Sequence, residues 1–157
     1  MSERSDVGGT AMSTATAAQG TAAAAQHSAV ISWDCEQTVL RFMAHFDAGE
    51  YEEMKTYFSA SGTWRRPTLT IEGHDGFDEH VAVAVPGRVM RHVITNMRTT
   101  LLTDTTAVVE SYFTVYLRDG GRTQGTAPSA VGRYTDRLER HAGGWVIADR
   151  EVHRDIH

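Results

Sequence analysis

Several residue types and patterns that define large classes of protein are scarce or missing in this sequence. Cys35 is the only cysteine among 157 residues, which excludes an intrachain disulfide and a paired-thiolate metal site and indicates a reducing, cytoplasmic setting. The longest apolar run covers five residues, 81–85, far short of the ~18 that a membrane-spanning helix requires. Lysine occurs once, and the net charge of −5 argues against nucleic acid as a partner. These absences leave a globular domain with neither a membrane nor a nucleic acid as its partner.

The first 30 residues lack the large hydrophobic side chains that a core needs. Residues 11–30 contain nine alanines, and Ser, Thr, Gly and Gln make up most of the rest. Because such a composition buries little apolar surface, we expect a disordered tail over residues 1–30 and one folded domain over residues 31–157. No leucine-rich stretch follows the charged N-terminus, so a secretory signal is not expected.

Helical periodicity begins at Ser32, a candidate N-cap. Val39, Phe42 and Phe46 recur at a spacing that places them on one helix face, and Gly49 ends the pattern. Two shorter helices are predicted over residues 50–58 and 77–85.

The second half of the chain changes to a period of two and is rich in β-branched and aromatic residues. Strands are predicted over residues 89–102, 107–117, 130–140 and 145–152, joined by turns that contain Gly or Asp. Two short strand pieces precede them, over residues 63–65 and 68–71. Helices followed by an antiparallel meander are typical of an α+β fold.

Five short motifs, in this order, resemble the SnoaL-like family of the nuclear-transport-factor-2-like superfamily. They are Phe42-x3-Phe46-Asp47-Ala48-Gly49-Glu50-Tyr51, Arg91-His92-x3-Asn96, Ser111-Tyr112-Phe113, Gly132-Arg133-Tyr134-x3-Leu138 and Gly144-Trp145. The resemblance covers residues 32–154 and implies a cone, in which a curved antiparallel sheet wraps around the N-terminal helices and encloses a pocket. Scytalone dehydratase, ketosteroid isomerase and polyketide cyclases are relatives. The chain departs from many of them at residues 58–61, where it lacks their aspartate.

Two residues in these motifs are candidates for catalysis. Asp47 falls on the apolar face of the first helix, where it either shapes the turn into Gly49 or faces a ligand. His92 lies in a predicted strand, and an isolated strand histidine is more often structural. The resemblance implies a catalytic pair, in which His92 is the general acid/base and Asp47 orients it, or Asp47 is the base and His92 the acid.

The resemblance also implies the reaction class. We expect an enzyme without cofactor or metal, a dehydratase, isomerase or cyclase, that acts on a hydrophobic oxygenated small molecule such as a polyketide, aromatic or terpenoid intermediate. The expected substrate-binding residues are Phe42, Phe46, Tyr51, Trp64, Phe77, Val81, Met90, Asn96, Phe113 and Tyr134. The eight histidines show no HExxH spacing and no cysteine partner. The alternative is a non-catalytic ligand-binding protein, or the small subunit of a ring-hydroxylating dioxygenase.

The outer face of the predicted sheet is a candidate for self-association. Alternation along residues 107–117 places Tyr112, Thr114 and Tyr116 on the face opposite Phe113 and Val115. Exposed aromatic side chains on a sheet face are typical of an interface. We therefore expect a homo-oligomer, either a homodimer or a homotrimer.

Overall fold

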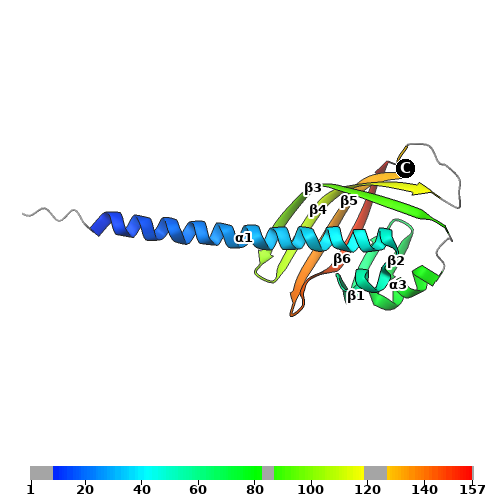
Figure 1. Cartoon of the computed structure of the whole chain (residues 1–157), viewed down its shortest axis with the longest axis horizontal. Coiled ribbons are helices and arrows are strands. Elements are labelled where there is room, and N and C mark those ends of the chain that lie inside the picture. Colours follow the sequence, from blue (N-terminus) through cyan, green and yellow to red (C-terminus); the bar gives the residue numbers. More distant parts are fainter. Residues whose placement is uncertain (1–8, 83–86, 119–126, 157) are drawn as a thin grey trace, which may run out of the picture.

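A computed structural model describes residues 9–82, 87–118 and 127–156 of the chain, without the side chains of residues 9–18 and 82. Within these ranges the elements follow in the order α1 (Gly9–Ala48), α2 (Tyr51–Lys55), β1 (Phe58–Arg66), β2 (Leu69–Glu72), α3 (Gly73–Ala82), β3 (Val89–Thr103), β4 (Thr106–Arg118), β5 (Ala130–His141) and β6 (Gly144–Ile156). The sheet curves around the C-terminal half of α1, whose N-terminal half projects beyond it (Figure 1). The predicted α+β fold is confirmed.

The six strands form one sheet in the order β2-β1-β6-β5-β4-β3. Strands β3, β4, β5 and β6 are joined as antiparallel hairpins, as the alternating pattern predicts. Strand β1 differs from the expected antiparallel arrangement because it pairs with β6 in parallel. The chain leaves β1, forms five further elements and returns beside it, and a crossover of this length allows parallel pairing.

Helix α1 is longer than the sequence predicts. Its buried residues Ile31, Cys35, Val39, Phe42 and Phe46 face the sheet. Residues 19–30 are all exposed, yet they continue the same helix, where the alanine-rich composition predicted a disordered tail. Alanine has the highest helix propensity, and a helix that is already held by packing extends into such a segment without a new nucleation cost. This segment therefore contributes helix but no core.

The other element boundaries differ modestly from the prediction. Helix α2 ends at Lys55 rather than at residue 58, because Phe58 is buried and begins β1. Helix α3 begins at Gly73, four residues before the predicted start at residue 77. The predicted end of that helix, residues 83–85, lies outside the described residues. So do residues 119–126, in the predicted connection between the strands over 107–117 and 130–140.

Two charged residues lie in the core beneath the sheet. Arg150 and Asp136 are both completely buried, and the guanidinium donates two hydrogen bonds to the carboxylate, from Nε at 2.6 Å and from Nη2 at 2.9 Å. The guanidinium also lies over the rings of Phe42, Trp64 and Tyr134, at 4.7, 5.6 and 4.4 Å from the ring centres. The ion pair is therefore enclosed by buried aromatic side chains.

Candidate active site

The end of α1 determines where Asp47 lies. Gly49 has a φ of +76°, and the N–H groups of Gly49 and Glu50 donate to the carbonyl oxygens of Phe46 and His45. This pattern is a Schellman motif, which closes a helix through a left-handed glycine. Asp47 is thereby held in the last turn of α1, directly after Phe46 on the face that packs against β3.

Asp47 and His92 are joined by two short hydrogen bonds. The Oδ1 atom of Asp47 lies 2.6 Å from Nδ1 of His92, and its Oδ2 atom accepts the backbone N–H of His92 at 2.6 Å. The side chains are only 11% and 7% exposed, respectively. An ionised carboxylate can only accept, so Nδ1 carries the proton and Nε2 is the basic nitrogen of the neutral ring.

Arg91, the neighbour of His92, also binds the C-terminal end of α1. Arg91 donates from Nη1 to the backbone carbonyl of Asp47 at 3.0 Å, so two consecutive residues of β3 bind the end of α1. The ring of His92 packs at 68° against that of Phe46, with 5.9 Å between their centres. Hydrogen bonds and ring packing together restrict His92 to one orientation.

His92 lines a cavity of about 310 Å³ between the sheet and the helices. This volume is at the small end of the range for small-molecule sites, roughly 300 to 1,000 Å³. The described lining residues are Phe46, Trp64, Arg66, His80, Arg88, Met90, His92, Phe113, Val115, Leu117, Ser129, Ala130, Tyr134, Val152 and Arg154. Five of the expected substrate-binding residues are therefore at the cavity: Phe46, Trp64, Met90, Phe113 and Tyr134.

Four other expected substrate-binding residues do not line this cavity. Phe42 and Phe77 are completely buried in the core, where each packs against Phe58. Tyr51 packs against the ring of Phe46 from α2, and Val81 is half-buried on α3. These four residues were expected at a pocket wall, and an apolar side chain that faces inward belongs as readily to the core as to such a wall.

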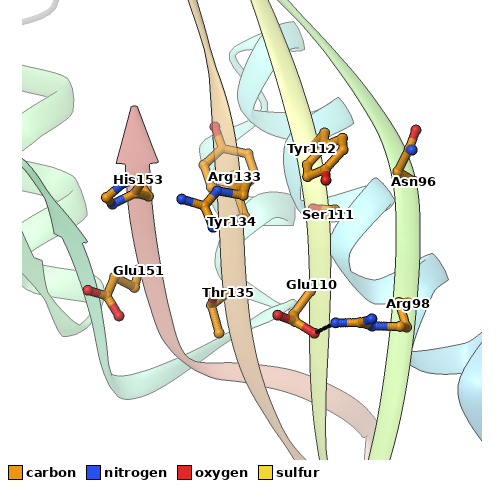
Figure 2. A pocket seen from close by; sticks show the side chains of 10 residues that line it. All are labelled: Asn96, Arg98, Glu110, Ser111, Tyr112, Arg133, Tyr134, Thr135, Glu151 and His153. Carbon is orange, nitrogen blue, oxygen red and sulfur yellow. Dashed lines mark hydrogen bonds and ion pairs between the residues drawn. The ribbon is translucent and has the colours of Figure 1, made fainter. Parts of the chain in front are cut away.

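Asn96, the tenth expected substrate-binding residue, does not line the cavity of His92 either. Its φ is +52°, and it lies where the pairing of β3 with β4 shifts between Thr95 and Arg98. Strict alternation would put Asn96 on the same face of the strand as His92, but a bulge adds a residue to the strand and so reverses the alternation beyond it. Asn96 instead lines a polar hollow of about 610 Å³ on the outer face of the sheet (Figure 2). That hollow is larger, but it contains neither Asp47 nor His92.

The sequence reasoning missed the polar lining of the cavity, above all Arg66, His80, Arg88 and Arg154. Strand alternation carried a signal for two of them, because Arg66 is two residues from Trp64 and Arg154 is two residues from Val152. An arginine in a strand is usually a surface residue, so the shared strand face of these pairs did not suggest that the arginines line a cavity.

Tyr134 is the buried hydroxyl group of this cavity. Its ring stacks on that of Phe113 with 4.3 Å between centres, and burial raises the pKa of Tyr134 to about 12 despite the opposing effect of Arg150. The phenol is therefore protonated at neutral pH and can donate a hydrogen bond.

Two kinds of feature are absent from the described residues. No group of three or more His, Cys, Asp or Glu side chains is arranged to hold a metal ion. No helix is both long and apolar enough to cross a membrane.

Comparison with solved structures finds the same fold in proteins of low sequence identity. A provisionally named scytalone dehydratase from Novosphingobium aromaticivorans is 18% identical, with a TM-score of 0.71 over 84% of this chain and 89% of that one. A Catenulispora acidiphila protein in complex with S-DNPA is 23% identical, with a TM-score of 0.67 over 81% and 95%. ActVI-ORFA from Streptomyces coelicolor is 18% identical, with a TM-score of 0.64 over 78% and 95%.

Comparison of sequences gives the family. No curated protein matches this chain. The family model of the SnoaL-like domain matches residues 31–151, which include α1 from the buried Ile31 onward and both members of the Asp47–His92 pair. The chain therefore belongs to the family of SnoaL-like domains.

Proposed function

We propose that this protein is a cofactor-independent enzyme that moves a proton on a hydrophobic, oxygenated small molecule, with His92 as the general acid/base. The observation that carries the proposal is a histidine in the wall of a cavity, bound to a buried carboxylate through Nδ1. A carboxylate at Nδ1 fixes the tautomer and leaves the lone pair of Nε2 free to accept a proton. The reaction class is dehydration, isomerisation or cyclisation.

The first step is common to all three reactions. Nε2 of His92 takes a proton from the carbon beside a carbonyl group, and the C–H electron pair forms the enolate. In a dehydration, the C–O bond of the β-hydroxyl group then breaks as the C=C bond forms. The proton on Nε2 passes to the leaving oxygen, so that water departs and His92 is neutral again.

The bonding of Asp47 favours a positioning role over that of the base. Both carboxylate oxygens already accept hydrogen bonds from His92, one from the ring and one from the backbone. A carboxylate that left these donors to take a substrate proton would strand a buried N–H group, which costs about 1–3 kcal/mol. Asp47 instead stabilises the imidazolium that forms when His92 takes the proton.

Tyr134 is the donor for the enolate oxygen in this proposal. Its phenol is protonated at neutral pH and belongs to the same cavity as His92. A neutral donor in a site of low dielectric stabilises a developing oxyanion without prior reorganisation. The aromatic walls Phe46, Trp64 and Phe113 suit a planar substrate.

The test measures the shared first step, so it does not require the natural product. NMR follows the exchange of the α-protons of 2-tetralone for deuterium, with and without protein. We expect His92→Ala to lower the catalysed exchange about 10²- to 10⁴-fold. Asp47→Asn should also slow it, and the double variant should lose far less than the product of the two losses, because the residues act as one unit. His153→Ala is the matched control, since His153 is exposed on β6.

Three outcomes would contradict the proposal. A His92→Ala protein with full exchange activity and a lowered melting temperature would show that the pair is structural. A wild-type protein that binds 2-tetralone without accelerating exchange would indicate a ligand-binding protein instead. Copurification with a larger iron-containing chain would identify the small subunit of a ring-hydroxylating dioxygenase.

A further inference from the structure

The cavity that contains His92 is lined by several cationic side chains. Arg66 of β1, Arg88 beside β3 and Arg154 of β6 line it, together with His80 of α3. None of the described lining residues is acidic. A concave site that gathers charge of one sign raises the local concentration of ligands of the opposite sign.

Arg66 and Trp64 present buried donors for which the described part of the chain supplies no acceptor. Nε of Arg66 and Nε1 of Trp64 are both buried, and neither has a hydrogen-bond partner among the described residues. The guanidinium of Arg66 lies over the indole ring, 4.3 Å from its centre, so the two groups are side by side. Buried donors normally have partners, and each exception requires an explanation.

His80 contacts Arg66 but does not neutralise its charge. A guanidinium only donates, so the 3.3 Å contact between Nη2 of Arg66 and Nε2 of His80 makes His80 the acceptor, in its neutral form. Burial lowers the pKa of His80, and Arg66 and Arg88 lower it further. Burial also lowers the pKa of Arg66, as do Arg154 and Arg150. Burial is the largest cause of both shifts, and the neighbouring arginines add to it because several guanidiniums lie close to this cavity.

We infer that the substrate carries a carboxylate, which accepts hydrogen bonds from Nε of Arg66 and Nε1 of Trp64. This inference rests on the proposed function, because it takes the His92 cavity to be the substrate site. A carboxylate has two oxygens for these two donors, and its bond to a guanidinium is about twice as strong as a neutral hydrogen bond. The substrate is then an aromatic or alicyclic acid, with its ring between the aromatic walls and its carboxylate at Arg66.

A matched pair of probes tests the charge without requiring turnover. Isothermal titration calorimetry compares 1-naphthaleneacetate with its neutral isostere, 1-naphthaleneacetamide. We expect the wild-type protein to bind the acid about 10- to 100-fold more tightly, which is the effect of one charged hydrogen bond. Arg66→Gln should abolish this preference, because only the acid gains a charge-assisted hydrogen bond from the guanidinium. Trp64→Phe keeps an aromatic ring, lacks the indole N–H and should reduce the preference.

Two further variants separate this inference from the proposed function. Arg133→Gln removes an arginine from the outer sheet face and should keep the preference, which controls for overall charge. His92→Asn should keep the preference for the acid even though it loses α-proton exchange. If His92→Asn exchanges protons normally, the proposed function fails while the charge preference stands.

Three results would overturn the inference. The first is equal affinity of the wild-type protein for acid and amide, or no binding of the acid. The second is an unchanged preference in a folded Arg66→Gln protein. The third is tighter binding of 1-naphthyl phosphate than of the acid, with displacement by inorganic phosphate, which would assign the site to a phosphate ester.

Discussion

The buried ion pair between Arg150 and Asp136 allows a strong prediction about stability. Both side chains have no exposed surface, and two hydrogen bonds join them. Arg150→Met keeps an apolar stem in the core but leaves the Asp136 carboxylate without either donor. Removing one partner of a buried pair costs about 3–5 kcal/mol, because the remaining charge is desolvated and uncompensated.

The replacement of both residues should cost less than the single change. Arg150→Met combined with Asp136→Leu removes the charge together with its partner, and apolar replacements of a buried pair are often close to neutral. Urea denaturation at pH 7 measures the free energy of unfolding of the wild type, the Arg150→Met protein, the double variant and a control. Arg98→Met is the matched control, because Arg98 pairs with Glu110 on the exposed face and its loss should change stability little.

The effect of pH follows from Asp136. Burial raises the pKa of Asp136, and Arg150 opposes this rise. Without Arg150 the folded protein binds a proton that the unfolded chain releases, so its unfolding free energy falls as the pH rises above the ordinary value, about 3.9. Arg150→Met should therefore lie closest to the wild type near pH 5 and furthest from it at pH 7. A gap below about 1 kcal/mol at pH 7, or one that widens towards pH 5, would refute this reasoning.

Two further predictions concern the ends and the outer face of the molecule. Removal of residues 1–28 should leave the melting temperature and the exchange activity nearly unchanged, because residues 19–28 are all exposed; a large loss in differential scanning calorimetry would show that this part of α1 packs on the domain. The wild-type protein should sediment as a homo-oligomer, and Tyr112→Arg should shift it towards the monomer, because Tyr112 is 51% exposed on the outer sheet face. A wild-type monomer at micromolar concentration would contradict this.

Local sequence patterns predicted the elements that position Asp47 and His92, but they did not predict features that depend on contacts between distant parts of the chain. The apolar spacing of α1 and Gly49 placed Asp47 at the inward end of the helix. Alternation also predicted the long strands to within a few residues. The bulge at Asn96 has no Gly or Pro to mark it, and the parallel pairing of β1 with β6 depends on contacts distant in sequence. The helix over residues 9–30 was missed because alanine-rich composition fits both a disordered tail and a helix.

Hydrophobicity and charge were also poor guides to what lines the cavity. Phe77 and Trp64 are both buried aromatic residues, yet only Trp64 belongs to the cavity. Arg66 reads as a surface residue in the sequence, although one of its nitrogens is buried. Composition predicts that a side chain is buried or exposed, whereas a cavity wall needs the positions of residues from several elements.

Trp64 shows how the core and the cavity are linked. Two guanidiniums lie over its ring, that of Arg66 at 4.3 Å and that of Arg150 at 5.6 Å. Arg150 has a carboxylate from the chain itself, Asp136, on two of its nitrogens. No ion pair joins Arg66 to an acidic side chain among the residues that the structure describes. The fold thus neutralises the arginine that it buries completely. Arg66, at the cavity, keeps a buried Nε donor that has no partner among the described residues, and that donor is where the carboxylate of a substrate would bind.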